Sequence, residues 1–335
     1  MAGPSSDRDR RPGPTAFGLG LLTALELPGA WEPRPLSEPI VQLLAATPAE
    51  VAQSWSGFAA IGWEGTIDGA PFTVERGQAG DHRFVHGAPP DEHGAPVAGT
   101  RAIYHLCADA RVLRCAPSDP TDGTWWREVL DSALFTVALL RGYEALHAGA
   151  IATPHGAVAV TAASGGGKST LLSELLARGS TLMTDDVLVV EPGGAREPPR
   201  AHPGPPLMTV PAVRLGALSG ALAPAVPELL AALEDERWIA LAVHPQPLAL
   251  AAVVVLNRSP GLDTELRLAE RPLAALLGAL LRFPRTPERE RSRFETAGAI
   301  AAHVPIWQLD ADPSVVPGVL ADQLAPERLI RIPSG

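Results

Sequence analysis

One short Gly-rich segment constrains the fold of this 335-residue chain more than any other feature. Residues 162–170 read Ala-Ala-Ser-Gly-Gly-Gly-Lys-Ser-Thr, which fits the Walker A pattern G-x4-G-K-S/T with Ala162 in the first glycine position. The apolar stretch from Ala157 to Ala162 predicts a buried strand, and the periodic stretch from Lys168 to Arg178 predicts a helix that ends at Gly179. A strand, a Gly-rich loop and a helix in this order are typical of a phosphate-binding loop.

The residue types of this loop suit a polyphosphate. Small residues let successive backbone N–H groups curve around the phosphates, and the helix that follows adds the positive end of its dipole. In this pattern the Lys168 ammonium reaches the β- and γ-phosphates, and the Ser169 hydroxyl ligates Mg²⁺. The alternative, a Gly-rich turn without a ligand, leaves the flanking strand and helix unexplained. The sequence therefore predicts a site for ATP and Mg²⁺ made by Ala163, Ser164, Gly165, Gly166, Gly167, Lys168, Ser169 and Thr170.

Two adjacent carboxylates follow the loop. Asp185 and Asp186 come 17 and 18 residues after Lys168, behind the short apolar stretch Leu182-Met183. Because the predicted helix runs back along the sheet and the chain returns as a strand, we expect both carboxylates at the same edge as the loop. There one can take a proton from an attacking hydroxyl, and the other can hold Mg²⁺. In isolation an Asp-Asp pair is more often a solvated turn, and which residue has which role stays open.

The stretch from Leu146 to Val190 resembles the catalytic domain of the HPr serine kinase/phosphorylase family. Within that family it is most similar to the divergent HPr-kinase-related proteins of bacteria. Spacing carries the resemblance: His147 lies 21 residues before Lys168, and Asp185 lies 17 residues after it. The continuous similarity covers about residues 140–192.

The resemblance implies an ATP-dependent kinase with a phosphoenolpyruvate-carboxykinase-like P-loop fold, which phosphorylates a serine-type hydroxyl on a protein or peptide. Lys168 and Ser169 would hold the phosphates and Mg²⁺, with Asp186 as a further metal ligand. Asp185 or Asp186 would be the base, and His147 would support the site. Related kinases act on precursor peptides in biosynthetic clusters such as those of lasso peptides, so a precursor peptide is one expected substrate.

The chain departs from the bifunctional enzymes of that family at several places. Thr170 stands where those enzymes have an acidic residue, and no glutamate signature occurs near Met208-Thr209-Val210. The N-terminal half does not resemble theirs. These departures argue against phosphorylase activity and against HPr as the substrate.

Other function classes remain in view. The main alternative is a regulator or biosynthetic accessory protein that binds ATP without transferring phosphate, and a small-molecule kinase is a further one. A transport-type ATPase fits less well, because Ala217-Leu218-Ser219-Gly220 is a poor match to the LSGGQ signature.

The rest of the chain suggests an α/β fold with a smaller β-rich domain in front of the P-loop domain. We expect a disordered tail over residues 1–14, a β-rich domain over 15–123, and the P-loop domain over 124–335 with its core at 146–192. A helix is predicted from Thr124 to Leu140. Further helices are predicted at Pro227–Glu236, at Pro272–Leu281 and from near Pro313, and strands at Phe72–Glu75, Arg83–His86, Ala102–Cys107, Arg111–Cys115, Val187–Val190, Leu248–Leu256 and Val304–Leu309.

Composition narrows the partners. The chain has 27 Lys plus Arg against 37 Asp plus Glu, a net charge of −10, which argues against a nucleic-acid partner. Its apolar runs fall short of the ~18–20 residues that a membrane span needs. Two cysteines occur, and in a hairpin that turns at Asp109-Ala110, Cys115 lies opposite Tyr104 rather than Cys107. We therefore expect free thiols in the cytoplasm, and a homo-oligomer is compatible with the sequence.

One basic cluster is left over. Arginines interleave with Glu288 and Glu290 at positions Arg282, Arg285, Arg289, Arg291 and Arg293. Two hypotheses stay open: a solvated and self-paired helix start, or a mobile loop that offers arginine to the transferred phosphoryl group or to an acidic substrate. Arg237 is a second candidate of the latter kind.

Overall fold

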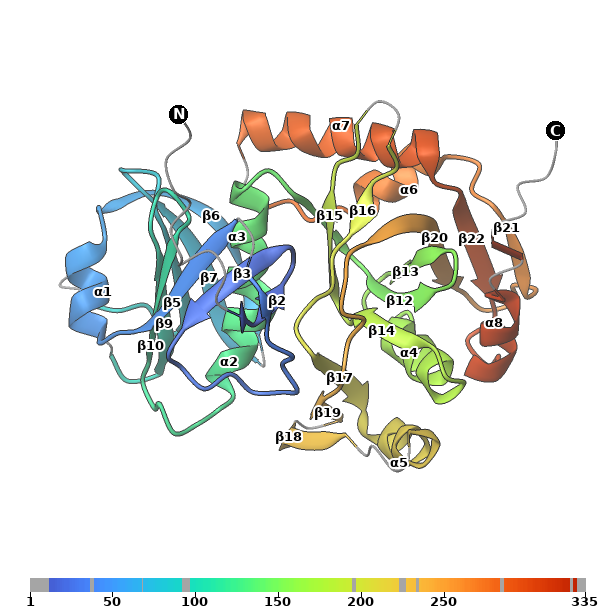
Figure 1. The fold of residues 1–335 in the computed structure, drawn as a ribbon, viewed down its shortest axis with the longest axis horizontal. Helices are drawn as coiled ribbons and strands as arrows, with labels where there is room; N and C mark the ends of the chain where they lie inside the picture. The colour runs from blue at the N-terminus through green and yellow to red at the C-terminus, as the bar shows by residue number, and fades with distance from the viewer. Residues whose placement is uncertain are drawn as a thin grey trace. The chain divides into compact units, whose positions relative to one another are not determined.

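The computed structural model describes residues 12–36, 39–67, 69–91, 97–194, 197–222, 227–232, 235–283, 286–325 and 328–329. The fold is mixed α/β with several sheets, and the chain divides into two compact units (Figure 1). Unit 1 comprises Met1–Gly142 with Arg282–Arg289, and unit 2 comprises Tyr143–Leu281 with Glu290–Gly335.

Unit 1 is built on an eight-stranded sheet with the order β2-β3-β5-β10-β9-β8-β7-β6. The strands are β2 (Thr15–Ala16), β3 (Leu19–Thr23), β5 (Ile40–Ala45), β6 (Phe58–Ile67), β7 (Ala70–Gly77), β8 (His82–Gly87), β9 (Thr100–Leu106) and β10 (Val112–Pro117). A separate pair joins β1 (Pro12–Gly13) to β4 (Arg34–Pro35). The predicted hairpin register is confirmed, since Cys115 lies opposite Tyr104 and both cysteines are free thiols.

The helices of unit 1 were only partly predicted. The short helix α1 (Pro48–Ser54) begins with a capping box, in which Thr47 and Glu50 bond each other's backbone, a pattern visible in the sequence. The segment after Thr124 forms α2 (Trp125–Glu128), a π-helical turn (Val129–Ala133) and α3 (Leu134–Leu140).

This helical segment, expected at the start of the P-loop domain, lies in unit 1. The buried Tyr104 hydroxyl on β9 donates to the carbonyl of Trp125 at 3.0 Å, which ties the segment to the eight-stranded sheet.

Unit 2 holds a nine-stranded sheet in which β20 joins two branches. Its strands are β11 (Glu144–His147), β12 (Gly149–Thr153), β13 (Gly156–Ala162), β14 (Thr181–Thr184), β15 (Val187–Glu191), β16 (Arg200–Ala201), β20 (Leu248–Arg258), β21 (Glu265–Leu268) and β22 (Ile306–Ala311). Strand β20 runs parallel to β13 and β22, while β12 is antiparallel to both β13 and β14. The carboxyl ends of β13, β14, β20 and β22 therefore meet at one edge of the sheet.

Helices cover both faces of this sheet (Figure 1). The helices are α4 (Lys168–Ala177), α5 (Ala212–Ala221), α6 (Pro272–Ala279), α7 (Pro287–His303) and α8 (Pro317–Gln323). On one face Val160 and Val254 pack with α4 and α8, and on the other Ala159 and Val253 pack with α6 and α7. Apolar residues at successive positions of β13 and β20 follow from this burial on both faces.

One predicted helix is wrong. Residues 228–232 and 236–240 form β18 (Glu228–Ala232) and β19 (Glu236–Ala240), and not a helix over Pro227–Glu236. They build a three-stranded sheet with β17 (Leu207–Pro211) in the order β17-β19-β18. Strand β18 pairs with β19 in a hairpin, and β19 pairs in turn with β17; this cross-strand pairing outweighs the local helical pattern.

Most other predicted elements of unit 2 are confirmed. The strand before the loop is β13, the helix after it is α4, and Gly179 follows with a φ of 92°. The expected helix near Pro313 begins at Pro317. Among the described residues, none of the helices is both long and apolar enough to cross a membrane.

Candidate active site

The Gly-rich loop adopts a backbone that its glycines make accessible. Gly165 and Gly167 have φ values of 72° and 90°, in the left-handed region that favours glycine. The N–H of Gly166 donates to the carbonyl of Ala163 at 2.8 Å, and a methyl group on Gly166 would lie 2.8 Å from the same oxygen. Helix α4 starts directly behind the loop, and the N–H of Leu171 donates to Gly167 at 2.9 Å. The loop thus turns tightly into the helix N-terminus, as a phosphate loop does.

The first turn of α4 carries the residues predicted to face a nucleotide. Lys168 is its first residue, and Ser169 and Thr170 follow it, while Ala163 and Ser164 lie in the loop itself. The Ser173 hydroxyl donates to the backbone carbonyl of Ser169 at 2.7 Å. This bond does not involve the Ser169 hydroxyl.

Lys168, Asp186 and His147 form one charged cluster. The Lys168 ammonium bonds Oδ1 of Asp186, and Nδ1 of His147 lies 3.4 Å from Oδ2 of the same carboxylate. The Lys168 side chain is 8% exposed, whereas Asp186 is 53% exposed. The Lys168 ammonium is therefore buried, while the Asp186 carboxylate that it bonds still faces solvent.

The neighbouring Asp185 has a different environment. Its Oδ2 accepts a hydrogen bond from the N–H of Thr209 at 2.8 Å, and its buried Oδ1 has no hydrogen-bond partner among the described residues. Its backbone carbonyl lies 3.4 Å from the Lys168 ammonium. Thr209 is on β17, so this contact joins the small sheet to the edge that carries the loop.

These environments shift the pKa values of Asp185 and Asp186 in opposite directions. Burial raises the pKa of Asp185 to about 6, against the opposing charge of Lys168. Burial also opposes ionisation of Asp186, but the hydrogen bond from His147 and the charge of Lys168 outweigh it and hold its pKa well below the usual range. Two adjacent carboxyl groups with pKa values pushed apart are typical of sites that move protons.

The backbone around the cluster is closely packed. A methyl group on Gly149 would overlap the Asp185 carbonyl and the Leu172 side chain, so glycine is required where β12 passes beneath α4. The Thr161 hydroxyl donates to the His147 carbonyl at 2.8 Å and fixes the end of β11. Neither Gly149 nor Thr209 was singled out from the sequence, because their roles arise from contacts across the sheet.

The leftover arginine cluster does not form a free loop. Arg289 and Arg293 are buried, and Arg285 lies outside the described residues. Arg289 donates to the Leu139 carbonyl at 3.3 Å, and Arg293 pairs with Glu290 at 2.6 Å. Both belong to α7, so they lie in a helix as one of the two hypotheses expected; they are buried rather than solvated, and Arg293 is paired within the helix. Arg237 donates to the carbonyl of Glu236 at 2.7 Å.

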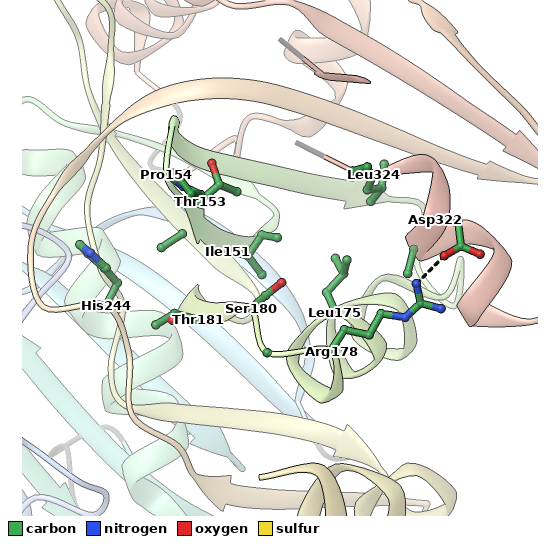
Figure 2. A pocket seen from close by; sticks show the side chains of 14 residues that line it. Ile151, Thr153, Pro154, Leu175, Arg178, Ser180, Thr181, His244, Asp322 and Leu324 are labelled. Atoms are coloured by element: carbon green, nitrogen blue, oxygen red, sulfur yellow. Dashed lines mark hydrogen bonds and ion pairs between the residues drawn. The ribbon is translucent and has the colours of Figure 1, made fainter. Parts of the chain in front are cut away.

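A pocket of about 630 Å³ lies at the other end of α4 (Figure 2). Its lining includes Thr153 and Thr181, which lie at the sheet edge opposite to the loop, and His244. Arg178, the residue after α4, bonds Asp322 of α8 at 2.6 Å on one side of this pocket. None of the predicted site residues lines it.

In the part of the chain that the structure describes, three or more His, Cys, Asp or Glu residues do not gather as a metal site.

The chain matches no protein-family model and no curated protein. Among solved structures, it is similar to the Hpr(Ser) kinase/phosphatase from Coxiella burnetii. The match has 15% sequence identity and a TM-score of 0.30, and it covers 55% of this chain and 96% of that chain. A likeness of this size carries no argument about function, so the function is argued from the site alone.

Proposed function

We propose that this protein is an ATP-dependent kinase that transfers the γ-phosphate of ATP to a hydroxyl group of a protein or peptide. The observation that carries the proposal is the Lys168–Asp186–His147 cluster directly behind a Gly-rich loop with two left-handed glycines. Backbone N–H groups, a helix N-terminus and a lysine together bind polyphosphate, and a carboxylate beside them can accept a proton.

In this proposal Asp186 is the base, because its carboxylate is exposed. The acceptor hydroxyl gives its proton to Asp186 as its oxygen forms the new bond to the γ-phosphorus, while the bond to the β–γ bridging oxygen breaks and ADP leaves. Asp185 suits this step less well, because its Oδ1 is buried and its Oδ2 already accepts from Thr209. His147 lies within 3.4 Å of Asp186 and orients that carboxylate.

The residues also fit Mg²⁺. In phosphoryl-transfer sites this ion takes one or two carboxylates together with the substrate phosphates. The Ser169 hydroxyl and the orphaned Oδ1 of Asp185 would hold the ion, which when bound neutralises charge on the phosphates, and Asp186 keeps the role of the base.

The finer fold assignment belongs to the same proposal. Strands β13, β14, β20 and β22 share one carboxyl edge that carries the loop and the acidic pair, an arrangement compatible with a phosphoenolpyruvate-carboxykinase-like P-loop domain. A precursor peptide remains the substrate that we propose, and the cytoplasm the place of action, on the resemblance stated above.

A second candidate is an ATP-binding regulator that transfers no phosphate. One observation favours it: Asp186 is already bound to Lys168 and His147, and a paired carboxylate is a weak base. In the kinase, nucleotide phosphates must draw Lys168 away from Asp186 before transfer.

Label transfer from γ-labelled ATP decides between the two. The full-length protein is incubated with Mg²⁺ and serine-containing peptides encoded beside it, with Lys168→Ala and Asp185→Ala/Asp186→Ala as controls. Labelled peptide formed by the unmodified protein and lost in both variants supports the kinase. Saturable ATP binding without labelled peptide supports the regulator, and absence of ATP binding contradicts both.

A further inference from the structure

Arg258 is the last residue of β20 and comes out beside the Gly-rich loop. Strand β20 runs parallel to β13, with Leu256 opposite Ala162, so both strands end at the same edge. Nη1 of Arg258 lies 3.2 Å from the position that a Cβ on Gly167 would occupy. The guanidinium therefore lies against the loop, although Arg258 is 90 residues beyond Lys168 in the sequence.

The hydrogen bonds that this guanidinium donates within the protein all come from one nitrogen atom, as far as the described residues show. Nη2 donates to the carbonyls of Val315 at 2.9 Å and Asp312 at 3.4 Å, and also to that of Pro313. These three bonds hold the segment 312–315, which follows β22. The Nε atom is buried and has no hydrogen-bond partner among the described residues.

In the described part of the chain Arg258 forms no direct ion pair. Hydrogen bonds from Ser314 are the main cause of the lowered pKa of the nearby Asp312, to which the charge of Arg258 only contributes. The carboxylate of Asp312 accepts instead from the N–H groups of Gly261 at 2.7 Å and Ser314 at 2.8 Å. An arginine that carries an orphaned donor and no ion pair, and that touches a phosphate loop, has the chemistry of a group that awaits an anion.

We propose that Arg258 binds the phosphates of the nucleotide together with Lys168, a proposal that rests on the function proposed above. Nη1, which lies against Gly167, supplies the donor that faces the ligand, while Nη2 keeps the segment 312–315 against the loop. Arg258 thus increases affinity for polyphosphates specifically, rather than for the nucleoside.

A purely structural arginine predicts something different. If Arg258 only braced the segment 312–315, replacing it would lower stability and would weaken all ligands of the site to the same extent. The ratio of MgATP affinity to adenosine affinity separates these two roles.

The test is calorimetric titration of the full-length protein with MgATP and with adenosine. We expect Arg258→Gln to weaken MgATP binding by about tenfold or more, the usual effect of losing a charge-assisted hydrogen bond, and to leave adenosine binding unchanged. Arg258→Lys, which keeps the charge but donates fewer bonds, should lower the MgATP-to-adenosine ratio by about threefold. Arg267→Gln is the matched control, because Arg267 bonds Asp310 at 3.1 Å on the neighbouring strand pair.

The outcomes keep the two proposals apart. If the unmodified protein binds no MgATP, the proposed function fails. If it binds MgATP and the ratio in Arg258→Gln equals that of the unmodified protein, the role of Arg258 is refuted and the function stands. Should Arg258→Gln fail to fold, an unchanged ratio in Arg258→Lys refutes the role in the same way.

Discussion

Two clusters of ionisable residues, one in each unit, contain similar residue types but differ in what they can do. In unit 2 Asp186 is 53% exposed and bonds a lysine and a histidine beside the Gly-rich loop. In unit 1 Asp81 bonds the Ser56 hydroxyl and lies 2.9 Å from Nε2 of His105, and Asp81 and His105 are only 3% and 2% exposed.

The order of contacts makes the difference. In the unit 1 cluster the carboxylate stands between the serine and the histidine, so His105 does not touch Ser56 and cannot take its proton. Asp81 also accepts from the N–H of Ser56 at 3.1 Å and thus fastens the β7–β8 turn. Serine, histidine and aspartate in contact are therefore not by themselves evidence of catalysis. The unit 2 cluster differs in that its carboxylate is exposed and lies beside the Gly-rich loop.

The largest expected effect comes from the exposed carboxylate. We expect Asp186→Asn to lower phosphoryl transfer by about 10²–10⁴-fold, since it removes the proton acceptor but keeps the side-chain shape. Initial rates of peptide labelling measure the effect. Asp322→Asn, an exposed carboxylate at the far end of α4, is the matched control and should leave the rate unchanged. Equal rates in the two variants would refute the role of Asp186.

Much of the site's placement could be predicted because it depends on local spacing. The buried strand, the loop, the helix and the turn at Gly179 follow each other directly, so the position of Asp185 and Asp186 at the loop edge could be read from the sequence. Thr209 and Arg258 could not, because both are distant in the sequence from the loop. Thr209 reaches the site through a backbone hydrogen bond to Asp185, and Arg258 through the pairing of β20 with β13. The apolar pattern of the segment 228–232 predicts part of a helix, whereas the segment pairs with β19 in a local hairpin.

The buried histidines of unit 1 should affect stability rather than activity, and the pH dependence that arises from His82, next to Asp81, is the next largest effect. Both ring nitrogens of the buried His82 lack hydrogen-bond partners among the described residues, and burial lowers its pKa to about 4. In the unfolded chain His82 keeps the ordinary histidine pKa of about 6.5, so the unfolded chain takes up the proton at a higher pH than the folded protein. The free energy of unfolding therefore falls as pH drops from about 6.5 to about 4. The loss attributable to His82 is about 3 kcal/mol at most.

Replacing the His82 imidazole tests the predicted direction of the pH dependence. We expect His82→Phe, which preserves the ring contact with Phe283, to flatten the dependence of urea-unfolding free energy on pH between 4 and 6.5. Burial also lowers the pKa of His105 and of His202, which leaves a residual slope. Burial raises the pKa of Asp185, which contributes the opposite slope. His155→Gln, at an exposed histidine, is the control, and an unchanged slope in His82→Phe would contradict the account.

A smaller effect on stability is expected from Ser56 of the unit 1 cluster. Ser56→Ala removes the hydroxyl that bonds Asp81 and should cost about 2 kcal/mol of unfolding free energy. Phosphoryl transfer at a temperature well below the melting point should stay unchanged. A loss of transfer without a loss of stability would mean that the unit 1 cluster takes part in the chemistry.

The most direct test of the contrast between the clusters is hydrogen–deuterium exchange of the full-length protein with and without MgATP. The account predicts slower exchange in peptides that cover residues 163–170 and 185–187, and no change in peptides that cover β8 and β9, which carry His82 and His105. Protection confined to β8 and β9, or none anywhere, would contradict the claim that the loop edge of unit 2 is the nucleotide site.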